Sequence, residues 1–248
     1  MTPADKSRHC RREKWCTDVD SQQLPQGTAK TVAVRQMFDT IAPKYEFINR
    51  LMTFGLDRRW RTKAVESLRL PRGSVVLDIA AGTGDFTREL AKQGQRAIAT
   101  DMSFGMLASG YEMGTSFQAD AQRLPFENAS MDGVTCGYAL RNFTDLAATL
   151  REMGRVVRPG GRIAILEVAE PTSGLLRAGF RCWFRGVVPF IGGIFSDRAA
   201  YAYLPKSTAY LPPRDQMLQL FRDAGFTAVN HQLVMGGLSQ QILATRAS

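Results

Sequence analysis

The sequence contains few residues of the kinds that bind metals or form disulfides. Its 248 residues include four cysteines and two histidines. Cys10, Cys16, Cys136 and Cys182 form no C-x-x-C pair, and His9 is the one histidine close to Cys10 and Cys16. A structural zinc site needs four ligands at characteristic spacings, so we expect no metal. Reduced thiols, as in cytoplasmic proteins, are the simpler interpretation.

Long apolar segments are also lacking. The longest apolar run covers residues 186–195, contains a proline and is too short to span a bilayer. The first residues lack the apolar core of a secretory signal. We therefore expect a cytoplasmic protein that does not cross the cell membrane. Peripheral contact with the inner face of that membrane is compatible with this expectation.

Acidic residues are scarce relative to basic ones. The chain has 32 Lys and Arg against 23 Asp and Glu, a net charge of +9. Such a charge favours an anionic partner: nucleic acid, an acidic substrate or a membrane surface. Arg177, Arg181 and Arg185 repeat every four residues beside an apolar face, which is typical of a helix on an anionic membrane. The alternative is a helix packed on its own domain with solvated arginines.

The order of apolar segments predicts an α/β fold. Residues 1–30 are polar and basic, and we expect them to form a mobile tail. One domain is expected over residues 31–248. Helices are expected near residues 32–41, 45–53 and 57–68. Strands are expected at 75–79, 97–100, 117–119, 133–138, 163–168, 226–234 and 238–245, with helices between most of them. Five parallel strands and an antiparallel closing pair give a seven-stranded Rossmann-like sheet. Residues 171–211 interrupt the alternation and are expected to form an inserted helical cap.

A glycine-containing loop marks a nucleotide-type cofactor site. Residues 78–85, D-I-A-A-G-T-G-D, follow the first strand, and Asp101 ends the second. Ligands of open α/β sheets bind at these carboxyl ends, and glycines let a ligand approach the backbone. An acidic residue about 20 positions after the loop is suited to a ribose diol. Asp120 and Ala121 follow the third strand, where they are placed to contact an adenine; the alternative for Asp120 is a turn cap.

The acidic residues favour S-adenosylmethionine over a dinucleotide. A pyrophosphate binds at the N-terminus of the first helix, where Asp85 would repel it. S-adenosylmethionine carries an ammonium, a sulfonium and a ribose, all of which suit carboxylates. We expect the cofactor to be bound by the following residues: Asp78, Ala80, Gly82, Thr83, Gly84, Asp101, Met102, Asp120, Ala121 and Gly137.

Several segments together resemble the ubiquinone/menaquinone biosynthesis C-methyltransferases. Residues 45–60, with Y-E-F-I-N and a later Trp60, are similar to the family's Y-D-x-M-N and H-x-x-W. Residues 155–167, R-V-V-R-P-G-G-R through L-E, are similar to its second signature. The G-T-G-D loop, Asp120-Ala121 and the L-R-N at 140–142 also match. Departures include Asp57 in place of the histidine and Gly137 where many relatives have a serine.

The resemblance implies the class I methyltransferase fold and places Tyr45, Arg141 and Asn142 at the acceptor ring. The expected substrate is a prenylated quinol, methylated on a ring carbon, with Arg141 stabilising the oxyanion. The alternatives are an O- or N-methyltransferase of another lipophilic aromatic compound, and a nucleic-acid-binding protein on the same fold. No aromatic stacking motif supports the last, so no nucleic acid is expected. A homodimer is compatible with the sequence.

Overall fold

The fold was determined as a computed structural model, which describes residues 25–53, 55–110, 114–169, 171, 174, 178, 179, 203 and 206–248. Two helices, α2 (Gly27–Thr53) and α3 (Leu56–Leu68), precede the sheet. The sequence predicted two helices over this range. The structure has one continuous helix, α2, with Pro43 inside it. Met37, Ile41 and Ile48 form one buried stripe on both sides of the proline, so packing offsets its lost hydrogen bond. Residues 27–30 of the expected tail are helical, and residues 1–24 lie outside the described part.

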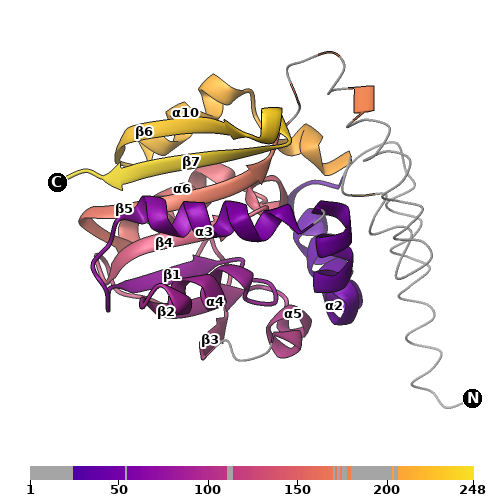
Figure 1. Cartoon of the computed structure of the whole chain (residues 1–248), viewed down its shortest axis with the longest axis horizontal. Helices are drawn as coiled ribbons and strands as arrows, with labels where there is room; N and C mark the ends of the chain where they lie inside the picture. The colour runs from indigo at the N-terminus through magenta and orange to yellow at the C-terminus, as the bar shows by residue number, and fades with distance from the viewer. Residues whose placement is uncertain are drawn as a thin grey trace, which may run out of the picture.

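A seven-stranded sheet forms the centre of the domain (Figure 1). Its strands follow the order β3-β2-β1-β4-β5-β7-β6, and all neighbours are parallel except β5 with β7 and β7 with β6. This confirms the predicted parallel sheet with an antiparallel closing pair. The strands are β1 (Val75–Ile79), β2 (Arg96–Asp101), β3 (Thr115–Gln118), β4 (Met131–Gly137), β5 (Val157–Val168), β6 (Phe226–Val234) and β7 (Ser239–Arg246).

Helices cover both faces of the sheet. In the described part of the chain the other α-helices are α4 (Asp85–Lys92), α5 (Phe104–Ser109), α6 (Leu146–Val156) and α10 (Arg214–Asp223), and the 3-10 turns include η1 (Leu140–Asn142). Alternate residues of one strand enter opposite cores. In β5, Ile163 packs with α6 and α10, and Ala164 packs with α3 and α4. Figure 1 shows α3 in front of the sheet and α2 at one end of it.

The connections diverge between β1 and β4. From β1 the chain passes through α4 to β2 on one side, whereas β4 lies on the other. This is the switch point at which ligands bind in open α/β sheets, outside the carboxyl ends of the strands. The helix α2 lies beside this edge and supplies one wall of the space above it.

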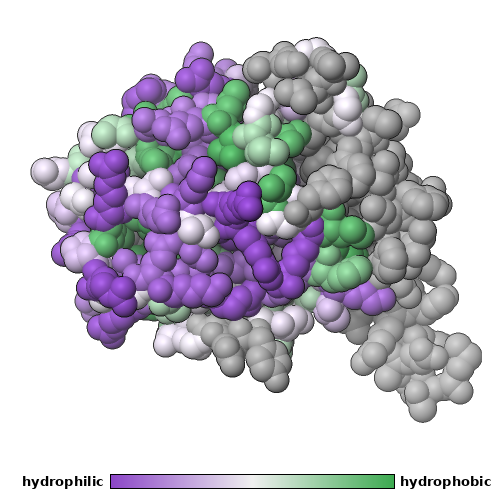
Figure 2. Space-filling view, in the orientation of Figure 1, coloured by the Kyte–Doolittle hydropathy of each residue, from purple (hydrophilic) through white to green (hydrophobic). Residues whose placement is uncertain are grey.

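The hydropathy of the surface differs between α3 and α2. Figure 2 shows mostly hydrophilic side chains over the face that carries α3, and a hydrophobic area on α2. Phe47 and Leu51, one helical turn apart, are exposed on α2. No helix within the described ranges is long and apolar enough to cross a membrane. Most of the expected cap at 171–211, including its three spaced arginines, lies outside the described residues.

Candidate active site

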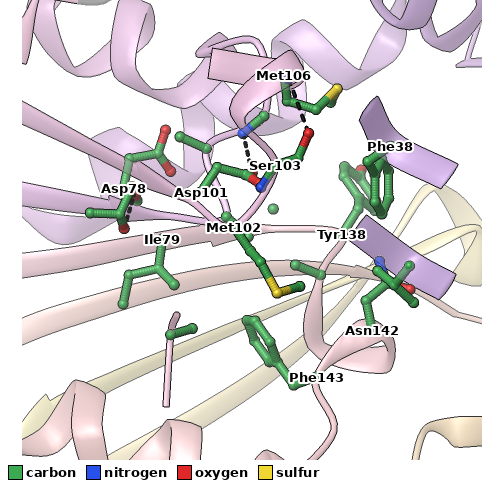
Figure 3. Close-up of a pocket in the computed structure, with 18 of the residues that line it drawn as sticks. Phe38, Asp78, Ile79, Asp101, Met102, Ser103, Met106, Tyr138, Asn142 and Phe143 are labelled. Carbon is green, nitrogen blue, oxygen red and sulfur yellow. Dashed lines mark hydrogen bonds between the residues drawn. The ribbon is translucent and has the colours of Figure 1, made fainter. Parts of the chain in front are cut away.

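A cavity of about 1020 Å³, counting its open mouth, lies at the carboxyl ends of β1, β2 and β4. Its walls come from the loops after these strands, from α2 and from η1. Figure 3 shows Asp78 and Ile79 of β1 on one side of it, and Phe38 of α2 and Asn142 of η1 on the other.

The loop after β1 has the backbone conformation that its glycines predict. Gly82 and Gly84 have φ values of 59° and 87°, in the left-handed region. A Cβ on Gly82 would lie 3.1 Å from the Met106 side chain. Ala80 (φ 53°) and Tyr138 after β4 (φ 59°) adopt the same region without being glycines. Such residues concentrate at functional sites, where the surrounding fold holds them in place.

Asp101 connects this loop to the end of β2. Its Oδ2 accepts a hydrogen bond from the N–H of Gly82 at 2.8 Å, and its Oδ1 accepts from the N–H of Ser103 at 2.8 Å. Burial raises the pKa of Asp101 to about 6, although these hydrogen bonds favour the charged form. The carboxylate is therefore fixed at the cavity wall, with further lone pairs that can accept hydroxyl groups.

Asp78 is almost wholly buried beneath the same loop. Thr87 Oγ1 donates to its Oδ2 at 2.7 Å, and Thr135 Oγ1 donates to its Oδ1 at 3.0 Å. Burial raises the pKa of Asp78 to about 7 against the effect of these bonds. The residue lines the cavity and at the same time joins β1 to α4 and β4.

The other expected cofactor residues also lie on the cavity wall. Asp120 does so while its Oδ1 accepts from the N–H of Gln122 at 2.9 Å, so that it caps a turn as well. Gly137 ends β4, and a Cβ there would lie 2.9 Å from the Phe86 ring. Hence a serine at this position would require Phe86 to move. The cavity is lined by Ala80, Gly82, Thr83, Met102 and Ala121 too; Gly84 caps α4 beside it.

Two of the three residues expected at the acceptor ring line the cavity. Tyr45 comes from α2 and packs edge-on against Phe38, with ring centroids 6.1 Å apart. Burial raises the pKa of Tyr45, while the charges of Arg61 and Arg141 act in the opposite direction. Asn142 reaches the cavity from η1, and its Oδ1 accepts a hydrogen bond from Tyr203 at 3.4 Å.

Arg141 lies next to the cavity with its guanidinium turned toward a buried acid. Its Nη1 forms an ion pair with Glu167 Oε1 and donates to the carbonyl oxygen of Tyr138 at 2.8 Å. Its Nε donates to Ser207 Oγ at 3.0 Å, and its backbone N–H donates to Glu167 Oε2 at 3.3 Å. These bonds fix η1 against β5. The oxyanion role expected for Arg141 stays a prediction.

Sequence reasoning missed Arg61 of α3. This buried side chain lines the cavity, pairs with Asp57 on its own helix and lies 3.5 Å from Asp85 Oδ2. Asp85 in turn pairs with Arg88 at 2.6 Å. The charge of Asp85 is thus shared with two arginines, which weakens the argument that its repulsion alone excludes a pyrophosphate. The sequence signal was an acid and a base four residues apart on a predicted helix.

The residues present suit S-adenosylmethionine. Asp101 and Asp120 follow adjacent strands and offer carboxylates where a ribose and an adenine would lie. The buried Asp78 and the neighbouring Asp85 offer negative charge to an ammonium, and the glycine loop leaves room beside the backbone. Among the described residues, no group of three or more metal-ligating side chains is found.

Solved structures that share this fold include methyltransferases. A phosphoethanolamine N-methyltransferase of Haemonchus contortus in complex with S-adenosyl-L-methionine has a TM-score of 0.58 at 15% identity, covering 77% of this chain and 53% of that one. A SAM-dependent methyltransferase of Thermotoga maritima has a TM-score of 0.61 at 19% identity, covering 86% and 99%. These likenesses show the fold, which is that of the class I methyltransferases, as the sequence predicted.

The chain belongs to the ubiE/COQ5 methyltransferase family, whose profile matches residues 26–246. A demethylmenaquinone methyltransferase of Roseiflexus castenholzii is 40% identical over 224 residues, 87% of this chain and 94% of the relative. A ubiquinone/menaquinone biosynthesis C-methyltransferase UbiE of Geobacter sulfurreducens is 40% identical over 217 residues, 83% and 85% of the two chains. The resemblance noted in the sequence is confirmed.

Proposed function

We propose that this enzyme transfers the methyl group of S-adenosylmethionine to a ring carbon of a prenylated quinol. The observation that carries the proposal is one cavity in which a cofactor wall, Asp78 and Asp101, faces the acceptor residues Tyr45 and Asn142. Relatives about 40% identical are named as methyltransferases of demethylmenaquinone or of the ubiquinone and menaquinone pathways. A quinol of this kind is therefore the substrate class that family membership favours.

The cofactor is bound along the carboxyl ends of the parallel strands. Asp101 accepts hydrogen bonds from the ribose hydroxyl groups, as a carboxylate fixed by two backbone N–H groups is suited to do. Asp120 and Ala121, after the neighbouring strand β3, contact the adenine. Thr83, Ala80 and the glycines Gly82 and Gly84 form the loop under the amino-acid part. Met102 and Gly137 border the ribose and the methionine chain, respectively.

Tyr45 and Asn142 orient the acceptor ring. Because burial raises the pKa of Tyr45, its hydroxyl stays a neutral hydrogen-bond donor at neutral pH. Within the described part of the chain, the side chain of Asn142 is hydrogen-bonded through Oδ1 alone, so its Nδ2 group can donate to a ring oxygen. Two donors directed at one hydroxyl oxygen stabilise it as it loses its proton.

Arg141 is proposed as a positioning residue with an electrostatic effect. Its ion pair with Glu167 fixes η1, and hence the neighbouring Asn142. Burial raises the pKa of Tyr45 and the charge of Arg141 acts against this rise, which supports an electrostatic effect of Arg141 on the acceptor region. A cation held there favours a phenolate over a phenol.

The chemistry needs positioning rather than a strong base. The cofactor supplies an electrophilic methyl group. A ring hydroxyl that gives its proton to water makes the adjacent carbon nucleophilic. That carbon would bond to the methyl group as the carbon–sulfur bond breaks. The ring carbon would then lose its own proton to water and the ring oxygen would be protonated again, which gives the methylated quinol. Holding the two reactants in line and excluding water accounts for most of such an acceleration.

Contact with an anionic membrane would bring the enzyme to a prenylated substrate. The net charge of +9 and the exposed Phe47 and Leu51 on α2 support a peripheral contact. Sedimentation with vesicles containing phosphatidylglycerol should recover more protein than sedimentation with neutral vesicles, and the difference should shrink with added salt. A homodimer remains a further proposal, which light scattering of the purified protein tests.

The proposed reaction is tested by supplying purified enzyme with S-adenosylmethionine and candidate acceptors in vesicles. We expect S-adenosylhomocysteine to form with reduced demethylmenaquinone or a reduced ubiquinone precursor, and not with the oxidised quinones, which lack the ionisable hydroxyl. Turnover of simple phenols or amines in place of both quinols would instead favour the O- or N-methyltransferase alternative.

A further inference from the structure

Arg61 is a buried cation on the wall of the cofactor cavity. It lies in α3, near the middle of the helix, and its residue is 6% exposed. Burial lowers the pKa of Arg61, but the negative charges of Asp85 and Asp57 contribute to raising it above its ordinary value. The guanidinium is therefore a permanent positive charge inside a cavity whose other charged groups are mostly carboxylates.

The guanidinium keeps donors that the protein does not use. Among the described residues, its ion pairs with Asp57 and Asp85 both run through Nη1. Its plane lies near the rings of Phe86 and Tyr138, with the central carbon 5.7 Å and 5.6 Å from their centroids. Nε and Nη2 therefore keep N–H groups without an ion-pair partner in the described part of the chain, and a guanidinium offers such groups in the fork that suits a carboxylate.

Its position corresponds to the amino-acid end of the cofactor. Along the sheet, Asp120 follows β3 and Asp101 ends β2, and these two residues are assigned to the adenine and the ribose. The next strands in order are β1 and β4. Arg61 contacts Asp85 and Phe86 at the start of α4, which follows β1, and Tyr138 directly after β4. A cofactor with its ribose at Asp101 extends its methionine chain toward this side.

The charges there match those of an amino acid. An amino acid carries its ammonium and its carboxylate on one carbon atom. Asp85 and Arg61 place a carboxylate and a guanidinium 3.5 Å apart on the cavity wall. Resting on the function proposed above, we infer that Arg61 binds the α-carboxylate of S-adenosylmethionine.

Asp57 is the positioning residue for this contact. Its carboxylate pairs with Arg61 and accepts hydrogen bonds from Thr53 Oγ1 at 2.7 Å and from Asn49 Nδ2 at 3.4 Å. Thr53 and Asn49 belong to the last turns of α2, so Asp57 fixes both the arginine and the junction of α2 with α3. In the family pattern this position is a histidine, and this chain has a carboxylate in its place.

The test compares two ligands on each protein by calorimetry. One is S-adenosylhomocysteine; the other is its decarboxylated analogue, with hydrogen in place of the carboxyl group. Wild type should bind the first about 10- to 100-fold more tightly, the range expected for a charge-assisted contact. Arg61→Met should lose most of this preference, because only the binding of S-adenosylhomocysteine becomes weaker. Arg61→Lys should keep part of the preference. Arg88→Met, which removes the other arginine beside Asp85, should keep the whole ratio.

The ratio of affinities separates binding from folding. A loss of stability in Arg61→Met reduces the folded fraction for both ligands equally, so the ratio reports the contact itself. If Arg61→Met keeps the wild-type ratio of the two affinities, the inference is overturned and the cofactor assignment stays intact. If that variant also loses turnover, Arg61 acts on the acceptor instead. Failure of wild type to bind S-adenosylhomocysteine would overturn the proposed function itself.

Discussion

The backbone N–H of Gly82 donates to Oδ2 of Asp101 at 2.8 Å, joining the loop after β1 to the end of β2. The same carboxylate accepts from Ser103 on the other side, and Ser103 Oγ is hydrogen-bonded to Asp39 of α2. One acidic residue thus connects the glycine loop, the start of α5 and, through a serine, the helix that covers the cavity. A cofactor bound at Asp101 would therefore be linked to α2 through these hydrogen bonds.

Asp101→Asn should weaken cofactor binding. An amide can accept only through its oxygen, so one of the two backbone N–H groups loses its partner and the ribose loses a charged acceptor. We expect S-adenosylhomocysteine to bind at least about tenfold more weakly, in line with the value of hydrogen bonds to charged groups. Calorimetry measures the affinity, with Asp39→Asn as a control on the same network. Unchanged affinity in Asp101→Asn would remove the residue from the cofactor site.

The raised pKa of Asp78 makes stability depend on pH. Burial raises this pKa to about 7, so the folded protein holds a proton that the unfolded chain releases at about pH 4. The free energy of unfolding of the cofactor-free enzyme should therefore decrease as the pH rises from about 4 through about 7. Asp78→Asn does not titrate and should flatten this part of the profile. Urea unfolding at pH 5 and pH 8 measures the free energy of unfolding of wild type and of Asp78→Asn. An equal change of this free energy between the two pH values in both proteins would contradict the prediction.

Arg141 and Glu167 should be tested as a pair. Arg141→Met alone leaves Glu167 buried without its counter-charge, which typically costs about 3–5 kcal/mol. Adding Glu167→Gln should restore much of the free energy of unfolding. If the charge of Arg141 serves the reaction, the double variant should bind S-adenosylhomocysteine normally yet turn over at least about tenfold more slowly. Recovery of turnover together with stability would leave Arg141 a purely structural role.

Tyr45→Phe separates the acceptor from the cofactor. The variant keeps the edge-on contact with Phe38 and removes only the hydroxyl group. We expect turnover to fall by about 10- to 100-fold, as for the loss of one oriented hydrogen bond at a reacting oxygen. The affinity for S-adenosylhomocysteine should stay within about twofold. A parallel loss of both would place Tyr45 on the cofactor rather than on the acceptor.

The cofactor half of the site was predictable because its residues follow one another at strand ends. Asp78, the glycine loop and Asp101 lie in a strand, loop and strand pattern, and parallel strands bring their carboxyl ends to one edge. Arg61 was not predictable in this way. It lies on a helix before the first strand, and only the packing of α3 on α4 brings it to Asp85 and Phe86.

Ion pairs between residues far apart in the sequence could not be predicted either. Glu167 is part of a recognised motif, but its partner Arg141 is 26 residues away and comes into reach only when β5 lies beside β4. The continuous α2 was missed because Pro43 normally ends a helix, and the buried stripe around it decided otherwise. In each case tertiary packing determined what local sequence left open.

The most direct test is the position of the transferred methyl group. The enzyme is incubated with S-adenosylmethionine labelled with ¹³C in its methyl group and with reduced demethylmenaquinone in anionic vesicles, and the product is analysed by NMR. The cavity described here predicts a label at the chemical shift of a methyl on a ring carbon, absent with the oxidised quinone. A label at the shift of a methoxy group would contradict ring methylation. So would the absence of label both from this quinol and from a reduced ubiquinone precursor supplied in parallel, while S-adenosylhomocysteine still binds.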